Sequence, residues 1–257
     1  MISFTSVELS AWITAFLYPL VRVLGFAAIA PIFNNLSIPR RVRLTLGLVI
    51  GLGIAPVVPP VTGIDINSGV GLWMLVREMG IGIAMGFAMR LVFAAVHVAG
   101  EQIGSQMGLG FAVFYDPMST AQTPVIAEYL VLLATLVFVS INGHLMMISA
   151  LAQSFQVIPI APTFLPAQGW LNIVLMAKII FSMGLLLALP VTAALIITNL
   201  SLGVLNRAAP QLNLFAIGFP ITITGGFILL TVTLNYLAVP FQRLFEEGLR
   251  MMLTFPG

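Results

Sequence analysis

Five charged side chains interrupt or border long apolar stretches, and they are the groups in this sequence best placed to do chemistry inside a membrane. They are Arg22, Arg77, Glu78, Arg90 and Glu101. Ionisable groups at membrane depth can couple ions or protons to the movement of a solute. A charge at the bilayer centre costs at least ~2.5–3.5 kcal/mol on insertion scales. We therefore expect buried charges that face protein or a watery cavity, not lipid.

Arg77 and Glu78 are neighbours in the sequence. Consecutive residues of a helix point about 100° apart, so the two side chains are not expected simply to pair with each other. Each then needs a partner on another helix or another subunit. The alternative is that the charges snorkel at segment ends, which suits Lys178 well and Arg22 poorly. The sequence leaves both interpretations open.

Motifs for catalysis do not occur in the sequence. It contains no His-Glu-x-x-His metal motif, no Gly-x-Ser-x-Gly nucleophile turn and no lysine in a glycine-rich phosphate loop. His97 and His144 are far apart and lack metal-ligand spacing, and Asp116 has no second apolar-embedded aspartate as a partner. We predict that the protein is not an enzyme and binds no metal or other cofactor.

The composition indicates a membrane protein. The 257 residues are 60% hydrophobic and 7% charged, whereas a soluble domain carries about 25% charged residues. No charged or low-complexity linker divides the chain, so we predict a single helical unit over residues 1–257. The absence of cysteine excludes disulfides and thiolate metal sites. The absence of a basic patch argues against a nucleic-acid partner.

Six apolar segments reach the length of roughly 20 residues that a spanning helix needs. They are Trp12–Pro31, Val42–Val61, Val70–Val98, Val125–Leu151, Ile173–Leu200 and Leu214–Pro240. All six are interpreted as helices, because strands of a membrane barrel would be about 10 residues of alternating character. The third segment runs on through Gly100–Gly110, either as one long helix or as a broken pair.

Glycines recur at helical spacing in this third region: Gly82 and Gly86, then Gly100, Gly104 and Gly108. Glycine at every fourth position clears one helix face, so that another backbone can approach closely. Since each such glycine costs about 1 kcal/mol relative to alanine in a soluble helix, close contact is the expected compensation. The contact lies either within the chain or at a subunit interface.

A loop bearing bulky aromatic residues is predicted over Gly110–Thr123, where Asp116 before Pro117 favours a turn. Aromatic side chains between spans ordinarily lie at the membrane interface. The alternative is a segment that folds back as a stopper, because non-helical backbone at membrane depth must be buried in protein or line a cavity. The residues alone favour the interface.

The stretch Asn206–Pro220 is a polar island in an otherwise apolar region, and Arg207 is its only charge. Pro210 interrupts a helix, and the apolar pattern resumes at Leu214. The stretch therefore predicts a turn between two helices.

Read in order, the polar islands resemble the FliR family of flagellar biosynthetic proteins and its type III secretion counterparts. The matching stretches are YPLVRVLGF (Tyr18–Phe26), APIFNNLSIPRRVRLTLG (Ala30–Gly47), GIAMGF (Gly82–Phe87), GEQIGSQMGLGFAVFYDP (Gly100–Pro117), NGHLMMIS (Asn142–Ser149), LALPV (Leu187–Val191) and LNRAAPQLNLFAIGFP (Leu205–Pro220). They spread over nearly the whole chain. The last is the most specific, because an Arg-x-x-Pro-Gln-Leu-Asn-x-Phe string does not recur by chance.

The resemblance implies a subunit of the export gate of the flagellar type III secretion apparatus. In that gate a chain of this family joins several copies of FliP and FliQ in a helical, pseudo-hexameric assembly at the basal body, in the bacterial inner membrane. FlhB surrounds its cytoplasm-facing entrance, and unfolded flagellar proteins pass through it. The family pattern further implies FliP-like helices in the first part of the chain and a FliQ-like hairpin in the last part.

The resemblance also implies residue roles. The loop Gln106–Gln122 corresponds to a plug in the pore, whose obstructive part comprises Gly110, Phe111, Phe114, Tyr115, Asp116 and Pro117. Subunit-interface residues are predicted at Arg207, Pro210, Gln211, Asn213, Phe215, Gly100, Gly104 and Gly108. The alternative function is a small-solute secondary transporter that uses Arg77, Glu78 and Arg90. Such a transporter should show internal repeats, and the sequence shows no convincing ones.

Overall fold

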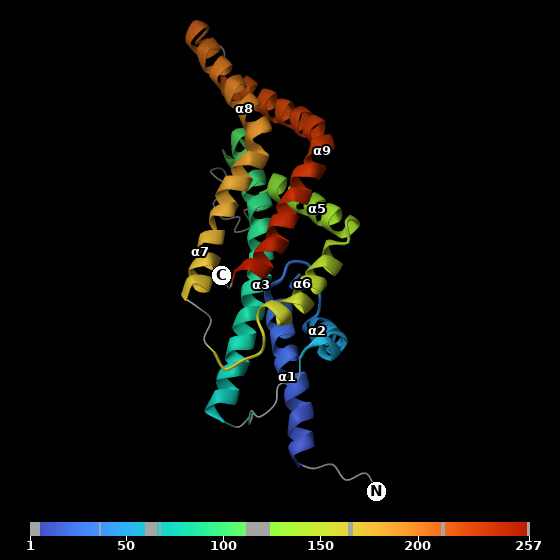
Figure 1. The fold of residues 1–257 in the computed structure, drawn as a ribbon. Coiled ribbons are helices and arrows are strands. Elements are labelled where there is room, and N and C mark those ends of the chain that lie inside the picture. Colours follow the sequence, from blue (N-terminus) through green and yellow to red (C-terminus); the bar gives the residue numbers. More distant parts are fainter. Residues whose placement is uncertain are drawn as a thin grey trace. The chain divides into compact units, whose positions relative to one another are not determined.

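The computed structural model describes residues 6–35, 37–59, 66, 68–111, 124–163, 167–211 and 214–255, and for residues 6–11, 111 and 214–216 it describes the backbone alone. Every regular element in these ranges is a helix (Figure 1). In chain order they are α1 (Ser6–Ile29), α2 (Arg40–Ile54), the 3-10 turn η1 (Ala55–Val57), α3 (Gly69–Gln106), the 3-10 turn η2 (Leu109–Phe111), α5 (Val125–Ser140), α6 (Gly143–Val157), α7 (Ala167–Met176), α8 (Lys178–Ala208) and α9 (Leu214–Thr254). The prediction of an all-α membrane protein is confirmed.

The described residues contain fewer candidate spans than the six predicted. In the described ranges four stretches are long and apolar enough to cross a bilayer, and the pair of α5 and α6 makes a fifth if it is counted as one broken span. The four are Trp12–Ile29, Gly69–Gln106, Ala167–Ala208 and Ile217–Thr254. Of the predicted segment Val42–Val61, the part up to Ile54 lies in α2, whose 15 residues fall short of the roughly 20 that a span needs.

Local backbone geometry decides where the remaining segments are continuous. The third segment forms one unbroken helix, α3, from Gly69 to Gln106. The predicted segment Val125–Leu151 is interrupted instead. Asn142 adopts the left-handed conformation there, with φ of 57°, which asparagine tolerates better than most residues. α5 therefore ends at Ser140 and α6 begins at Gly143.

The chain packs as two compact units that are interleaved in the sequence rather than consecutive. The first unit comprises Met1–Leu91, Asn142–Ala177 and Phe245–Gly257, and the second comprises Val92–Ile141 and Lys178–Leu244. The long helices α3 and α9 each contribute one part to the first unit and another part to the second.

In the first unit, glycines let α1 and α3 pack backbone against backbone. A methyl group built at Gly82 of α3 would overlap the carbonyl oxygen of Arg22 and lie 2.8 Å from the nitrogen of Phe26. One built at Gly86 would lie 2.8 Å from the oxygen of Phe26. These contacts leave no room for a side chain, so they hold the two helices close together and in one register.

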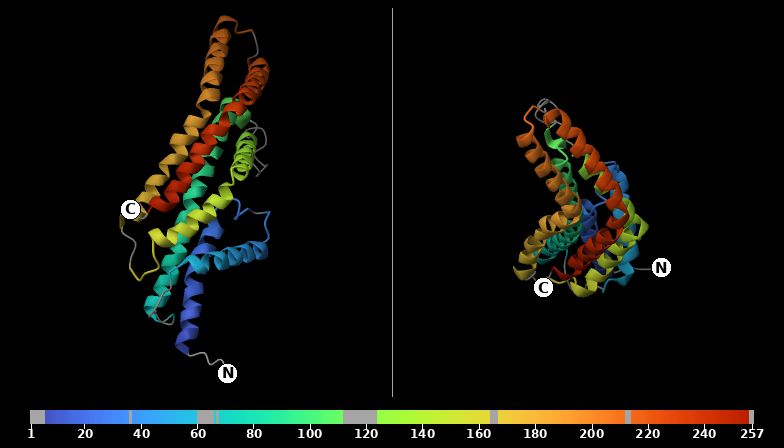
Figure 2. Two further views of the ribbon diagram at one scale, coloured as in Figure 1. Left: turned by 45° about the vertical axis from the view of Figure 1, so that its right-hand side comes forward. Right: turned by 90° about the horizontal axis from the view of Figure 1, so that it is seen from above.

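In the second unit, parts of α3, α5, α8 and α9 enclose an apolar core. Ile103, Leu130, Val191 and Leu230, one from each helix, line the same small cavity at its centre. Figure 2 shows α8 (orange) and α9 (red) side by side along this part of their lengths. The core packs the last turns of α3 against the middle of α9.

Candidate functional site

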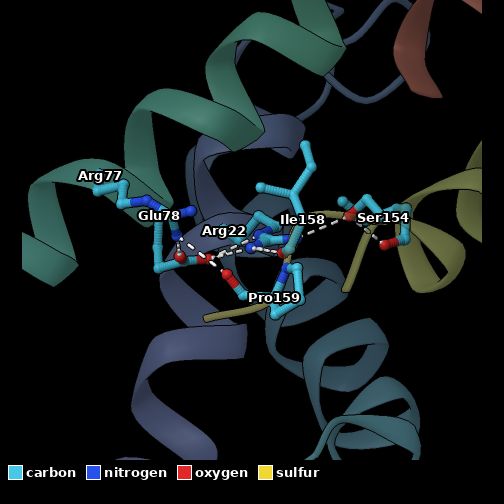
Figure 3. Close-up of polar contacts among 7 residues, drawn as sticks. Arg22, Arg77, Glu78, Ser154, Ile158 and Pro159 are labelled. Atoms are coloured by element: carbon cyan, nitrogen blue, oxygen red, sulfur yellow. Dashed lines mark hydrogen bonds and ion pairs between the residues drawn. The ribbon is translucent and has the colours of Figure 1, made fainter. Parts of the chain in front are cut away.

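Three charged side chains from two helices form one buried network in the first unit (Figure 3). Arg22 of α1 and Glu78 of α3 are completely buried. Nε and Nη2 of Arg22 both lie 2.6 Å from Oε2 of Glu78. Arg77 donates from Nη1 to the other carboxylate oxygen, Oε1, at 2.7 Å. Glu78 therefore binds one cation through each of its oxygens.

The other donors of Arg22 bind α6 and the residue that follows it. Nη1 donates to the hydroxyl of Ser154 at 3.0 Å, and Nη2 donates to the carbonyl of Ile158 at 2.9 Å. The guanidinium also lies over the ring of Phe155, with Cζ 4.0 Å from the ring centroid. Because a guanidinium carries five N–H donors in a rigid fork, this single side chain joins α1, α3 and α6.

The network buries two cations and only one anion. Besides its bond to Glu78, Arg77 donates from Nη1 to the carbonyl of Pro159 at 3.3 Å, while its buried Nε has no hydrogen-bond partner among the described residues. Burying an ion costs several kcal/mol, which only good geometry and further hydrogen bonds repay. The network is therefore sensitive to any change in its single carboxylate.

The prediction that Arg77 and Glu78 do not pair with each other is wrong, because their side chains form an ion pair. The angle of about 100° describes where the two side chains leave the helix. The flexible arginine chain then bends back far enough for its Nη1 to reach the carboxylate. Both residues also bind outside α3: Glu78 binds Arg22 of α1, and Arg77 binds the carbonyl of Pro159.

Arg90 and Glu101, which were also predicted to be buried charges, have side chains that are exposed on the chain. Glu101 and Glu128 flank His97, with carboxylate oxygens 3.6 Å from Nδ1 and 3.8 Å from Nε2. α3 is apolar on all sides, so its sequence does not reveal which face its neighbours cover. Among the described residues, no group of three or more such side chains is arranged to hold a metal.

The predicted subunit interface at Gly100, Gly104 and Gly108 is occupied by the chain itself, which corrects that prediction. A methyl group built at Gly100 would overlap the backbone of Ala127 of α5, and one at Gly104 would lie 3.7 Å from Ile126. One at Gly108 would lie 2.8 Å from the ring of Phe219 of α9. The spacing indicated close helix contact, but nothing in it distinguished a neighbouring helix from a neighbouring subunit.

The obstructive residues predicted for a pore plug begin at Gly110, shortly after α3 ends at Gln106. Gly110 is exposed and lies in η2 with Phe111. The side chain of Phe111, and all of Phe114, Tyr115, Asp116 and Pro117, lie outside the described residues.

The predicted turn after Asn206 is present, because α8 ends at Ala208 and α9 begins at Leu214. Three predicted interface residues are exposed there: Arg207, Pro210 and Gln211. Asn213 and the side chain of Phe215 lie outside the described residues. α9 continues through Pro220, so the turn ends earlier than the polar stretch that predicted it.

Sequence reasoning missed the partners that α6 provides for Arg22. The hydroxyl of Ser154 accepts the bond from Arg22 and donates its own proton to the carbonyl of Leu151 in α6. Such local bonding is common for serine in helices. The residues around Ser154 therefore do not predict its contact with Arg22. The contact with Ile158 cannot be predicted from residue type either, because every residue has a backbone carbonyl.

Comparison with known proteins assigns the chain to a family. The model of bacterial export proteins, family 1, matches residues 13–248. The flagellar biosynthetic protein FliR of Pectobacterium carotovorum subsp. carotovorum is 42% identical over 247 residues, which cover 96% of this chain and 94% of that protein. FliR of Escherichia coli K12 has the same identity and coverage. FliR of Bacillus subtilis 168 is 28% identical over 95% of this chain and 96% of its own length.

The matched residues include all the sequence stretches that resemble the family, and they extend from α1 into the last turns of α9. The chain is a member of the bacterial export proteins, family 1.

Proposed function

We propose that the chain is a structural and gating subunit of the flagellar type III protein export gate, where it forms part of the pore for unfolded flagellar proteins. The observation that carries the proposal is the match of nearly the whole chain to the export family and to flagellar biosynthetic relatives. On the same ground we propose a location in the bacterial inner membrane, at the flagellar basal body. FliP, FliQ and FlhB homologues are the proposed partners.

The lengths of the helices support an assembly larger than one chain in a bilayer. α3 has 38 residues, and at 1.5 Å per residue it is ~57 Å long. The span Ile217–Thr254 has the same length, and only 17% of an 18-residue apolar stretch within it is buried inside the chain. The hydrocarbon core of a bilayer is about 30 Å thick. We infer that neighbouring subunits cover much of the apolar helix surface that extends beyond the bilayer.

The end of α8 supports the same conclusion. Its apolar side chains are exposed in successive turns, including Ile197, Leu200 and Val204. They lead directly to the exposed Arg207 at the turn before α9. We propose that this hairpin, α8 with the first part of α9, is the FliQ-like part of the chain and that it packs against partner helices. FliP-like helices are proposed for the first part of the chain.

The transporter alternative has weaker support. Arg77 and Glu78 are bonded to each other and to groups on other elements, so their charges already have partners within a packed core. Arg90, the third residue of that hypothesis, is exposed. A coupling site would instead need charges that line a path for the ion.

Native mass spectrometry after gentle detergent extraction tests the proposed assembly. We expect a complex several times heavier than the 27.5-kDa chain, containing FliP and FliQ homologues.

Arg207→Ala should lower the fraction of chain in that complex without changing the thermal unfolding of the chain, because Arg207 is exposed. Arg243→Ala, at another exposed arginine, serves as the control. A stable lone chain that transports a small solute would overturn the proposal.

Deleting Gly110–Pro117 tests the proposed plug. We expect the closed gate to leak ions and small solutes, because the residues proposed to fill the pore are gone. The measurement is ion flux across membranes of cells that make the deletion variant, normalised to the amount of assembled complex. Cells lacking the FliP homologue are the control, since no pore should assemble in them. An ion-tight membrane despite full assembly would contradict the plug.

A further inference from the structure

Arg77 stands at one end of the buried network and binds it with only one of its three guanidinium nitrogens. Its Nη1 donates both to Oε1 of Glu78 and to the carbonyl of Pro159. Its buried Nε, like its Nη2, has no hydrogen-bond partner among the described residues. Figure 3 shows Arg77 on the far side of Glu78 from Arg22. Within the described part of the chain, the edge formed by Nε and Nη2 is therefore unpaired.

The elements around Arg77 supply no second anion. Residues 129–245, which include all of α6 and α7, contain neither Asp nor Glu. Among the described residues, Glu78 is the only carboxylate within ion-pair distance of Arg77, and Glu78 already pairs with Arg22. A buried donor without a partner is destabilising, and more so on a charged group. The network in the described chain thus has one positive charge more than it can neutralise.

Arg77 lies beside an exposed apolar surface of α3. Leu72, Val76 and Met79 are exposed and share a helix face, because they are three and four residues apart. Trp73, one turn before Arg77, is 37% exposed. We call Leu72, Trp73, Val76 and Met79 the α3 surface strip. The Arg77 side chain is itself 5% exposed, so a subunit that covers the strip would also close its remaining contact with water.

We propose that Arg77 is a binding site for a carboxylate, carried by an Asp or Glu side chain of a neighbouring subunit in the export gate. The Nε and Nη2 edge of a guanidinium matches the two oxygens of a carboxylate. A partner helix that is apolar except for one acidic residue would fit both the α3 surface strip and Arg77. This proposal rests on the proposed assembly. Formation of the complex, not folding of the chain, then neutralises the network.

Arg77→Met and Arg22→Met should rank in opposite order in the lone chain and in the complex. In the purified chain Arg77→Met should lower the thermal unfolding temperature less, because Glu78 keeps its pair with Arg22 and the excess buried charge is gone. In native mass spectrometry, normalised to folded chain, Arg77→Met should lower the assembled fraction severalfold and more than Arg22→Met does. Arg90→Met, at an exposed arginine of the same helix, is the control and should change neither measurement. The same ranking in both measurements would show that Arg77 merely stabilises the chain, and would overturn the proposal.

Arg77→Lys identifies the carboxylate. Treated with a carbodiimide, which activates carboxyl groups, the purified complex should form an amide between the introduced amine and an Asp or Glu of another chain. Mass spectrometry of the digested complex detects the linked pair of peptides. The unmodified complex is the control, because an arginine side chain does not form this amide. A link to Glu78 of the same chain alone, together with normal assembly of Arg77→Met, would contradict the proposal.

The outcomes separate this site from the proposed function. If the unmodified chain enters no complex, the proposed assembly fails and the carboxylate site fails with it. If the complex forms and Arg77→Met assembles as well as the unmodified chain, only the carboxylate site is wrong. A phosphate group also fits a guanidinium. If inorganic phosphate or phosphatidylglycerol in mixed micelles stabilises the unmodified chain but not Arg77→Met, and both assemble equally, the site binds phosphate and the proposal is overturned.

Discussion

Glu78→Gln is expected to destabilise the chain more than Arg22→Met, although both remove the same buried ion pair. Losing one partner of a buried pair typically costs about 3–5 kcal/mol. After Arg22→Met, Glu78 still pairs with Arg77, and the remaining network is neutral. After Glu78→Gln, two buried guanidinium groups share no anion. We therefore expect the loss for Glu78→Gln to reach or exceed the upper end of that range.

Unfolding of the purified chain in detergent, followed by circular dichroism, measures this difference. The double variant Arg22→Met with Glu78→Gln should recover part of the stability lost in Glu78→Gln alone, because it removes one of the two unpaired cations. Glu247→Gln is the control, because Glu247 pairs with the exposed Arg250, and exposed pairs contribute little. If Arg22→Met proved the more damaging single change, the hydrogen bonds to Ser154 and Ile158 would matter more than charge balance.

Gly82→Ala is expected to separate α1 from α3 and to lower the stability of the chain by about 1–3 kcal/mol or more, the range for overpacking a core. The new methyl group would overlap the Arg22 carbonyl and lie 2.8 Å from the Phe26 nitrogen. Backbone atoms cannot rotate away as a side chain can, so the helices must shift. That shift would also stretch the bond between Arg22 and Glu78.

Gly80→Ala is the matched control on the same helix. A methyl group there would meet only the ring of Trp170, at an ordinary contact distance of 3.7 Å. It should leave stability unchanged or raise it, since alanine is the better helix former. Thermal unfolding of the two variants beside the unmodified chain makes the comparison. Equal stability of both variants would show that α1 and α3 do not pack through Gly82.

The two predictions concern one structural feature, the close approach of α1 and α3. Gly82 lets the backbones meet where Arg22 must reach Glu78, so the glycine and the ion pair support each other. A variant that combines Gly82→Ala with Glu78→Gln should therefore lose less stability than the two single losses added together. Residues in contact commonly show such non-additivity.

The sequence by itself determined the class of the protein and the residues that needed explanation. Hydropathy and charge are properties of each segment, so they identify apolar helices and reveal that Arg22, Arg77 and Glu78 must find partners. The glycine spacing likewise indicates close helix contact, and Pro210 marks the turn before α9. The order of the polar islands was enough to recognise the family.

Only the tertiary structure decided which groups meet. Arg22 binds Glu78 across 56 positions of the chain and Ser154 across 132, and no local pattern records such a pairing. Gly108 faces Phe219 of its own chain, and Arg90 lies on an uncovered face of α3. The physical reason is that a helix apolar on every side has no preferred face of its own. Its buried face is chosen by the neighbours that pack against it.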